Sequence, residues 1–187
     1  MGVAVWRHPN PRDVAGRCIG RTDVLVDRRK AKRLAHRVRQ WARRHGAARV
    51  VFTSSLQRGA SVGRCLSRWG WQHRIDDRLN ELDFGAWDGQ AWAAIGASAV
   101  DAWCADFAHH APGSGEAVAA LLVRCRSFLD EHADARSCCV VGHAGWISAA
   151  QWLAAGRGAP TAGEWPASVG YGVRVEARVA ACCALPG

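Results

Sequence analysis

The stretch Val3-Ala-Val-Trp-Arg-His-Pro9 organises the rest of the chain. It is a short apolar run that ends abruptly in Arg7 and His8, and we interpret it as a buried strand. Such a strand would deliver a guanidinium and an imidazole to the carboxyl edge of a sheet, which is where open α/β sheets bind ligands. The segment Cys138-Cys-Val-Val-Gly-His143 has the same design. Together the two segments predict that His8 and His143 face each other at this edge.

Two further apolar runs are typical of strands that are buried on both faces. They cover residues 49–52 and 137–142, and the first continues into Thr53-Ser-Ser-Leu-Gln-Arg58. Residues 73–76 predict a short edge strand. Residues 168–185 alternate apolar and polar side chains in part and predict one or two terminal strands.

Segments with the apolar spacing of helices lie between these strands. The clearest begins after Asp27 as its N-cap and stops at Gly46. Thr53 or Ser55 could cap a second helix that reaches to about Gly70. Further helical segments are expected at residues 90–108, 116–132 and 145–155. Strands that alternate with helices predict a three-layer α/β/α sandwich, with a mostly parallel central sheet and helices on both faces.

Length and composition restrict the class of protein. With 187 residues, of which 49% are hydrophobic, the chain can bury a core, and we expect a single domain over residues 1–187. The net charge of +9 suits nucleic acid, a membrane surface or a small anionic substrate, or is simply a solvated basic surface. We interpret the basic residues within 27–46 as a solvated helix face. We attribute the ten tryptophans to the amino-acid usage of the source and draw no function from them.

The eight cysteines do not have the spacing of a disulfide scaffold. Cys138-Cys139 and Cys182-Cys183 are adjacent pairs, and no C-x-x-C occurs. The apolar run Val3 to Trp6 is too short for a signal sequence or a membrane span. The expectation is a reduced, cytoplasmic protein with no membrane segment. The cysteine and two histidines within residues 104–110 match no standard zinc spacing, so we expect no metal site and no cofactor.

Three separate strand ends carry cations or hydrogen-bond donors, namely Arg7 with His8, Arg58, and His143. The planar fork of arginine suits phosphate oxygens. His143 precedes an expected helix, whose first N–H groups and dipole favour an anion. No acid stands next to any of these residues. Such a set would furnish a pocket for a dianionic phosphoryl group.

An acidic loop over residues 77–89 supplies candidate proton donors. From charge alone Glu81, Asp83 or Asp88 could serve. Glu116 is placed at a helix start, where it would cap the helix or charge its first turn. The functional alternative is that it supports the residues that contact the substrate.

Five motifs in chain order resemble those of the histidine phosphatase (phosphoglycerate mutase-like) superfamily. Arg7-His8-Pro9 matches its Arg-His-Gly motif, and Thr53-Ser-Ser-Leu-Gln-Arg58 matches its second arginine motif. Glu81-Leu-Asp-Phe-Gly-Ala-Trp-Asp-Gly89 matches its acid motif. Gly115-Glu116-Ala117 matches the Gly-Glu-Ser helix start in part, and Val141-Gly-His143-Ala-Gly145 matches a Val-x-His-Gly-Gly segment. The resemblance covers nearly the whole chain.

The resemblance implies a metal-independent phosphomonoesterase that works through a phosphohistidine. His8 would be the nucleophile. Glu81, chosen among the three acids on the motif match, would be the general acid and then the general base. Arg7, Arg58 and His143 would hold the phosphoryl oxygens.

Within the superfamily, the loop Gly16-Arg-Cys-Ile-Gly-Arg-Thr-Asp23 and the small size are most similar to α-ribazole phosphatases, which remove a 5′-phosphate late in cobalamin assembly. Arg17 and Arg21 would bind the substrate tail or only solvate the loop. The expected partner is a small phosphorylated substrate and not nucleic acid, and the oligomeric state stays open. The alternatives are a broad small-molecule or sugar phosphatase, a phosphohistidine protein phosphatase, and a non-catalytic basic binding protein on the same scaffold.

Three departures from the family pattern concern the phosphate end of the site. Pro9 replaces a glycine and removes one backbone N–H. Asp13 lies nearest to the place of the usual asparagine and would repel phosphate there. Ala144 also replaces a glycine. We expect these changes to affect the identity of the substrate more than the activity.

Overall fold

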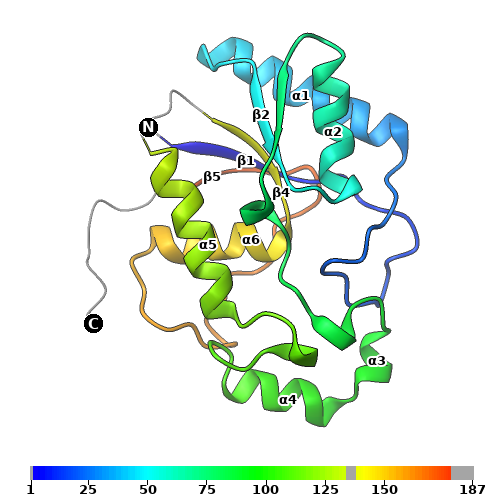
Figure 1. Cartoon of the computed structure of the whole chain (residues 1–187), viewed down its shortest axis with the longest axis vertical. Coiled ribbons are helices and arrows are strands. Elements are labelled where there is room, and N and C mark those ends of the chain that lie inside the picture. Colours follow the sequence, from blue (N-terminus) through cyan, green and yellow to red (C-terminus); the bar gives the residue numbers. More distant parts are fainter. Residues whose placement is uncertain (1, 134–137, 178–187) are drawn as a thin grey trace.

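The computed structural model describes residues 2–133 and 138–177 (Figure 1). Its centre is a five-stranded sheet in the order β3-β2-β4-β1-β5. The first four are mutually parallel, and β5 runs antiparallel to β1 at one edge. The strands are β1 Val3–Arg7, β2 Val50–Thr53, β3 Gln72–Ile75, β4 Cys139–Gly142 and β5 Arg174–Ala177.

Helices cover both faces of this sheet, which confirms the predicted α/β sandwich (Figure 1). Successive residues of β1 point to opposite faces, as the period of a strand requires. Ala4 and Trp6 pack with α1 and α2, whereas Val3 and Val5 pack with α5 and α6. The helices are α1 Arg28–His45, α2 Gln57–Ser67, α3 Trp92–Ile95, α4 Ala97–Ala105, α5 Val118–Glu131 and α6 Ala144–Ala154, with short 3₁₀ turns at Asp77–Leu79, Gly85–Trp87 and Pro112–Ser114.

The first helix has the predicted ends. The carboxylate of Asp27 accepts hydrogen bonds from the backbone N–H groups of Arg29 (2.7 Å) and Lys30 (3.4 Å). Gly46 follows the helix in the left-handed conformation at φ 62°, which glycine adopts without steric cost. Local capping residues were therefore enough to predict both ends of this helix.

The second helix differs from its prediction. It begins at Gln57 and ends at Ser67, and neither Thr53 nor Ser55 caps it. The Thr53 hydroxyl instead donates to the carbonyl of Ser54, 2.8 Å away. The N–H of Gln57 donates to the carboxylate of Asp23 at 2.7 Å, so a distant loop caps the helix.

The remaining elements lie near their expected places. The edge strand is present as β3, and the helical segment at 90–108 is divided at Gly96, which has φ 85°. The helix expected at 116–132 is α5 and begins two residues later, at Val118. The predicted terminal strands are represented by β5, and residues 178–185 of that prediction lie outside the described residues. Within 2–133 and 138–177, no helix has the length and hydropathy to cross a bilayer.

Candidate active site

The carboxyl ends of β1 and β4 bring the two predicted histidines together. The strands are parallel neighbours with Arg7 opposite Gly142, so His8 and His143 follow them side by side. Their ring centroids are 5.1 Å apart. Both side chains are buried, with His8 4% exposed.

The hydrogen bonding of His8 fixes which of its ring nitrogens carries the proton. Its Nδ1 lies 2.9 Å from the carbonyl oxygen of Pro9. A carbonyl only accepts, so Nδ1 carries the proton and Nε2 keeps its lone pair. Burial lowers the pKa of His8 to about 3, and the charges of Arg58 and Arg7 act in the same direction. The ring is therefore a neutral imidazole at physiological pH, which is the nucleophilic form.

His143 is tied to Arg58 rather than exposed in the pocket. The Nε–H of Arg58 donates to Nδ1 of His143 at 3.1 Å, and Nε2 of His143 lies 2.7 Å from the hydroxyl of Ser54. Burial, together with the charge of Arg58, holds the pKa of His143 well below its usual range. Both ring nitrogens are engaged, so a direct bond from His143 to a phosphoryl oxygen requires one of these contacts to be exchanged.

Arg7 is held by the segment before β5. Its Nη1 donates to the carbonyl of Val169 at 2.6 Å, and its guanidinium carbon lies 3.9 Å from the ring centroid of Tyr171. Among the described residues, its buried Nε has no hydrogen-bond partner. An arginine with a donor left over is suited to an anionic oxygen. Sequence reasoning missed Val169 and Tyr171, because neither belongs to a motif.

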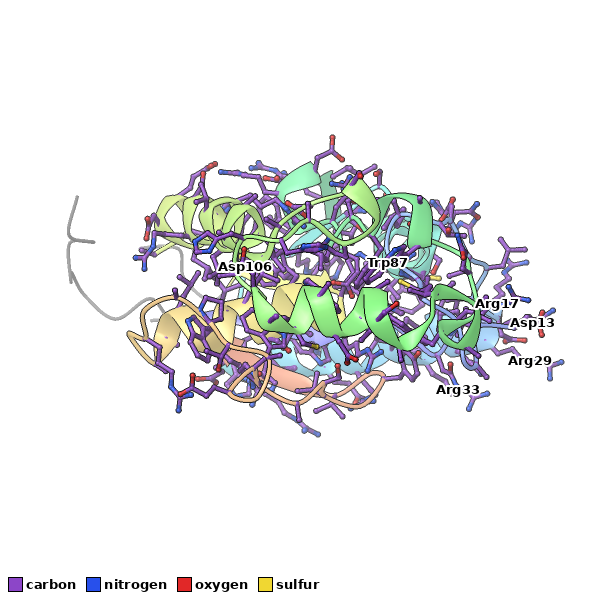
Figure 2. The ribbon with its side chains drawn as sticks, turned by 90° about the horizontal axis from the view of Figure 1, so that it is seen from below. Asp13, Arg17, Arg29, Arg33, Trp87 and Asp106 are labelled. Carbon is purple, nitrogen blue, oxygen red and sulfur yellow. The ribbon has the colours of Figure 1, made fainter. Side chains whose placement is uncertain are left out.

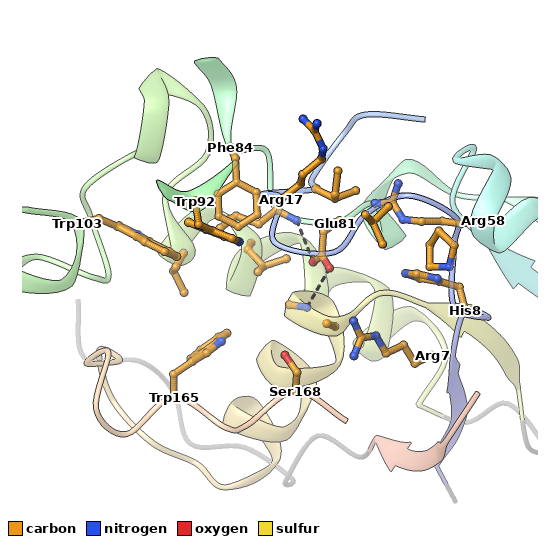
Figure 3. A pocket seen from close by; sticks show the side chains of 18 of the residues that line it. Arg7, His8, Arg17, Arg58, Glu81, Phe84, Trp92, Trp103, Trp165 and Ser168 are labelled. Atoms are coloured by element: carbon orange, nitrogen blue, oxygen red, sulfur yellow. Dashed lines mark hydrogen bonds between the residues drawn. The ribbon is translucent and has the colours of Figure 1, made fainter. Parts of the chain in front are cut away.

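Of the three candidate acids, Glu81 is the one that lines the pocket with His8. It is 7% exposed, and its carboxylate accepts the N–H groups of Leu82 (3.1 Å) and Gly145 (3.2 Å) (Figure 3). Asp83 instead accepts the N–H of Gly85 at 2.8 Å. Asp88 accepts hydrogen bonds from the loop after β1.

Glu116 supports the acidic loop through Arg124. Its carboxylate forms an ion pair with the guanidinium of Arg124 at 2.6 Å. Arg124 in turn donates to the carbonyls of Arg78 (2.8 Å), Asn80 (2.6 Å) and Glu81 (3.1 Å). Of the two roles considered for Glu116, the structure therefore favours support of the site.

The pocket itself has a volume of about 530 Å³, in the range of small-molecule sites. Arg7, His8 and Arg58 lie at one end and Glu81 lies between the two ends (Figure 3). The opposite wall is aromatic, and its members come from α3, α4 and several loops. They are Phe84, Trp92, Trp103, Phe107 and Trp165.

Sequence reasoning missed this aromatic wall, although the number of tryptophans was the available signal. Its members touch one another, with ring centroids 5.1 Å apart for Trp103 and Phe107 and 5.5 Å for Phe107 and Trp165. The residues lie far apart in the sequence, so no local pattern indicates that they share a wall.

The two loop arginines are placed differently. Arg17 lines the pocket, and its Nη1 donates to the carbonyl of Gly89 at 2.9 Å. Arg21 is exposed and is not among the described residues that line the pocket. Asp13 is also exposed and lies at the periphery of the molecule, on the side of Arg29 (Figure 2). Its charge is therefore directed to solvent.

An α/β sandwich with a neutral buried histidine, two arginines and a carboxylate at the strand ends is the framework of a phosphoryl-transfer enzyme. The family model of the histidine phosphatase superfamily (branch 1) matches residues 3–172. The chain belongs to this superfamily and is a phosphatase.

Solved structures share the fold of this chain. A protein described as mycobacterial hydrolase 1 is 27% identical, with 84% of this chain and 82% of that chain covered and a TM-score of 0.69. Mycobacterial glucosyl-3-phosphoglycerate phosphatase in complex with VO3 shares the fold at 23% identity (93% and 89% covered, TM-score 0.76). The α-ribazole phosphatase from Shigella flexneri does so at 24% identity (93% and 88% covered, TM-score 0.70). A sequence search among curated proteins gave no significant match.

Proposed function

We propose that the protein hydrolyses phosphomonoesters through a phosphohistidine on His8. Nε2 of His8 attacks phosphorus, the bond from phosphorus to the ester oxygen breaks, and Glu81 gives its proton to the departing oxygen. Water then attacks the phosphohistidine while Glu81 takes its proton, which releases inorganic phosphate and restores both side chains. The observation that carries this proposal is the anchored Nδ1 of His8, which leaves Nε2 free in the pocket that Glu81 lines.

Arg7 and Arg58 would stabilise the charge on the transferring phosphoryl group. Both line the pocket beside His8, and both are fixed by hydrogen bonds to the protein. Preorganised cations in a buried site are the main source of catalysis in phosphoryl transfer. These two guanidinium groups would perform this task without a metal ion.

The aromatic wall supports a substrate whose tail is planar and apolar. The substrate that best fits this description is α-ribazole 5′-phosphate, because its base is a flat benzimidazole that can stack on tryptophan. The sugar-acid tail named in the glucosyl-3-phosphoglycerate phosphatase is polar and suits this wall less well. On this proposal the reaction belongs to cobalamin assembly in the cytoplasm.

The test is phosphate release from α-ribazole 5′-phosphate beside a panel of sugar phosphates and phosphohistidine peptides, with EDTA present. His8→Ala is run in parallel. We expect EDTA-resistant turnover that disappears in the variant and prefers α-ribazole 5′-phosphate. Equal turnover of the whole panel would contradict the substrate but keep the chemistry. If no substrate of the panel is hydrolysed, the result would favour a non-catalytic binding protein on this scaffold.

A further inference from the structure

The carboxylate of Asp88 holds the loop after β1 by consecutive backbone groups. Its Oδ1 accepts the N–H of Gly20 at 2.9 Å and the hydroxyl of Thr22 at 2.8 Å. Its Oδ2 accepts the N–H of Thr22 at 2.9 Å and also the N–H of Arg21. Hydrogen bonds to a charged acceptor are stronger than neutral ones, so this loop is firmly attached to Asp88.

The opposite side of the same loop holds Arg58. The carbonyl of Thr22 accepts Nη1 of Arg58 at 2.8 Å, and the carbonyl of Gly20 accepts Nη2. Asp88 thus binds the N–H groups of two residues whose carbonyl groups bind the guanidinium. The conformation of this short loop sets where the guanidinium lies.

Two further contacts prevent the loop from shifting. A Cβ on Gly20 would lie 2.3 Å from the carbonyl oxygen of Leu82, so the loop packs directly against the residue after Glu81. Beyond the loop, the carboxylate of Asp23 caps Gln57, which immediately precedes Arg58. Displacement of the loop would therefore disturb Arg58 from both sides.

We propose that Asp88 is a positioning residue that fixes Arg58 through the loop of residues 20–22. The role assigned to Arg58 rests on the proposed function. The charge of Asp88 has a second effect. Burial lowers the pKa of Arg58, and the carboxylates of Glu81, Asp88 and Asp23 oppose this change.

A double-mutant cycle tests the proposal. Asp88→Asn keeps the shape of the side chain but places an NH2 group among the donors of the loop. With p-nitrophenyl phosphate as substrate, we expect it to lower kcat/KM by roughly 10- to 100-fold, as the loss of an orienting contact does elsewhere. Arg58→Ala should cost more. Because Asp88 acts through Arg58, the double variant should be no slower than Arg58→Ala alone.

The matched control is Asp101→Asn, which removes the same charge from an exposed position on α4 and should leave kcat/KM unchanged. Near wild-type activity of Asp88→Asn, or losses that multiply in the double variant, would overturn the proposal. If Asp88→Asn does not fold, Thr22→Val replaces it in the cycle. That variant removes only the hydroxyl bond and should give a smaller loss that is also absent in the Arg58→Ala background.

The same cycle is measured with inorganic phosphate by calorimetry, which separates this proposal from the proposed function. Phosphate binding that follows the cycle in a protein without turnover would contradict only the proposed function. Turnover that requires His8 but not Asp88 would contradict only the positioning role. A wild-type protein that neither binds phosphate nor turns over any ester would overturn both.

Discussion

The imidazole rings of His8 and His143 lie with their centroids 5.1 Å apart, at the ends of two neighbouring parallel strands. Two imidazolium cations at this distance would repel each other, and Arg58 beside them adds a third positive charge. Burial and these charges keep both rings neutral. This state gives His8 the lone pair that the proposed nucleophile needs, and it also links the stability of the fold to pH.

The free energy of unfolding should decrease as the pH falls below about 6.5. The folded-state pKa of His8 is lowered to about 3, so between these values the unfolded chain binds a proton that the folded chain does not. The slope for one such histidine is about 1.4 kcal/mol per pH unit. Urea unfolding at pH 7, 6 and 5 measures it. His8→Asn should reduce the slope by this amount. An unchanged slope in His8→Asn would contradict the neutral assignment.

Replacing Glu81 by glutamine should separate substrates by their leaving groups. The proton of Glu81 is needed where the departing oxygen is a poor leaving group, as in an alkyl phosphate. We expect Glu81→Gln to lower the rate of phosphate-ester cleavage by about 10²- to 10⁴-fold for such a substrate. The burst of p-nitrophenol from p-nitrophenyl phosphate should be much less affected. Asp83→Asn is the control, and an equal loss for both substrates would be evidence against the general acid.

Removal of the aromatic wall should weaken the binding of the substrate tail but not the chemistry. Trp165→Ala should raise KM for α-ribazole 5′-phosphate by about tenfold or more, since one stacked ring contributes roughly 1–3 kcal/mol. The kinetics with phosphoserine, which has no planar tail, should change little. Steady-state kinetics with both substrates decides this. A similar rise in KM for phosphoserine would indicate that the tryptophan shapes the phosphate end instead.

Arg124 should couple the stability of the fold to the position of Glu81. Arg124→Ala removes the guanidinium that pairs with the carboxylate of Glu116 and donates to the carbonyls of Asn80 and Glu81, and should reduce the free energy of unfolding by about 3 kcal/mol. It should also lower kcat. Arg126→Ala on the same helix is the control. Denaturant unfolding that is unchanged by Arg124→Ala would show that the loop is held by other contacts.

The parts of the fold that depend on neighbouring residues could be predicted from the sequence. The strand that ends at Arg7 and the helix between Asp27 and Gly46 are local patterns of apolar periodicity and capping. The cap of α2 was predicted wrongly, because the acceptor is Asp23, 34 residues before Gln57.

The same distinction applies to the site. Arg7, His8, Arg58 and Glu81 carry motif signals, and all four line one pocket. Many of the contacts that orient them are made by backbone groups, such as the carbonyls of Pro9, Val169 and Thr22. The hydrogen bonds from the N–H groups of residues 20–22 to the carboxylate of Asp88 are such a case. A carboxylate and three peptide N–H groups leave no periodicity in the chain, so only the folded structure shows them.

We expect His8 to become phosphorylated during turnover, and the mass of the Glu81→Gln variant mixed with p-nitrophenyl phosphate shows whether it does. Without its general base, this variant should hydrolyse the intermediate slowly and accumulate it. We predict an adduct of one phosphoryl group on the peptide that contains His8, labile in acid and absent from the double variant with His8→Ala. An adduct that persists in the double variant, or p-nitrophenol release with no adduct at all, would contradict the mechanism.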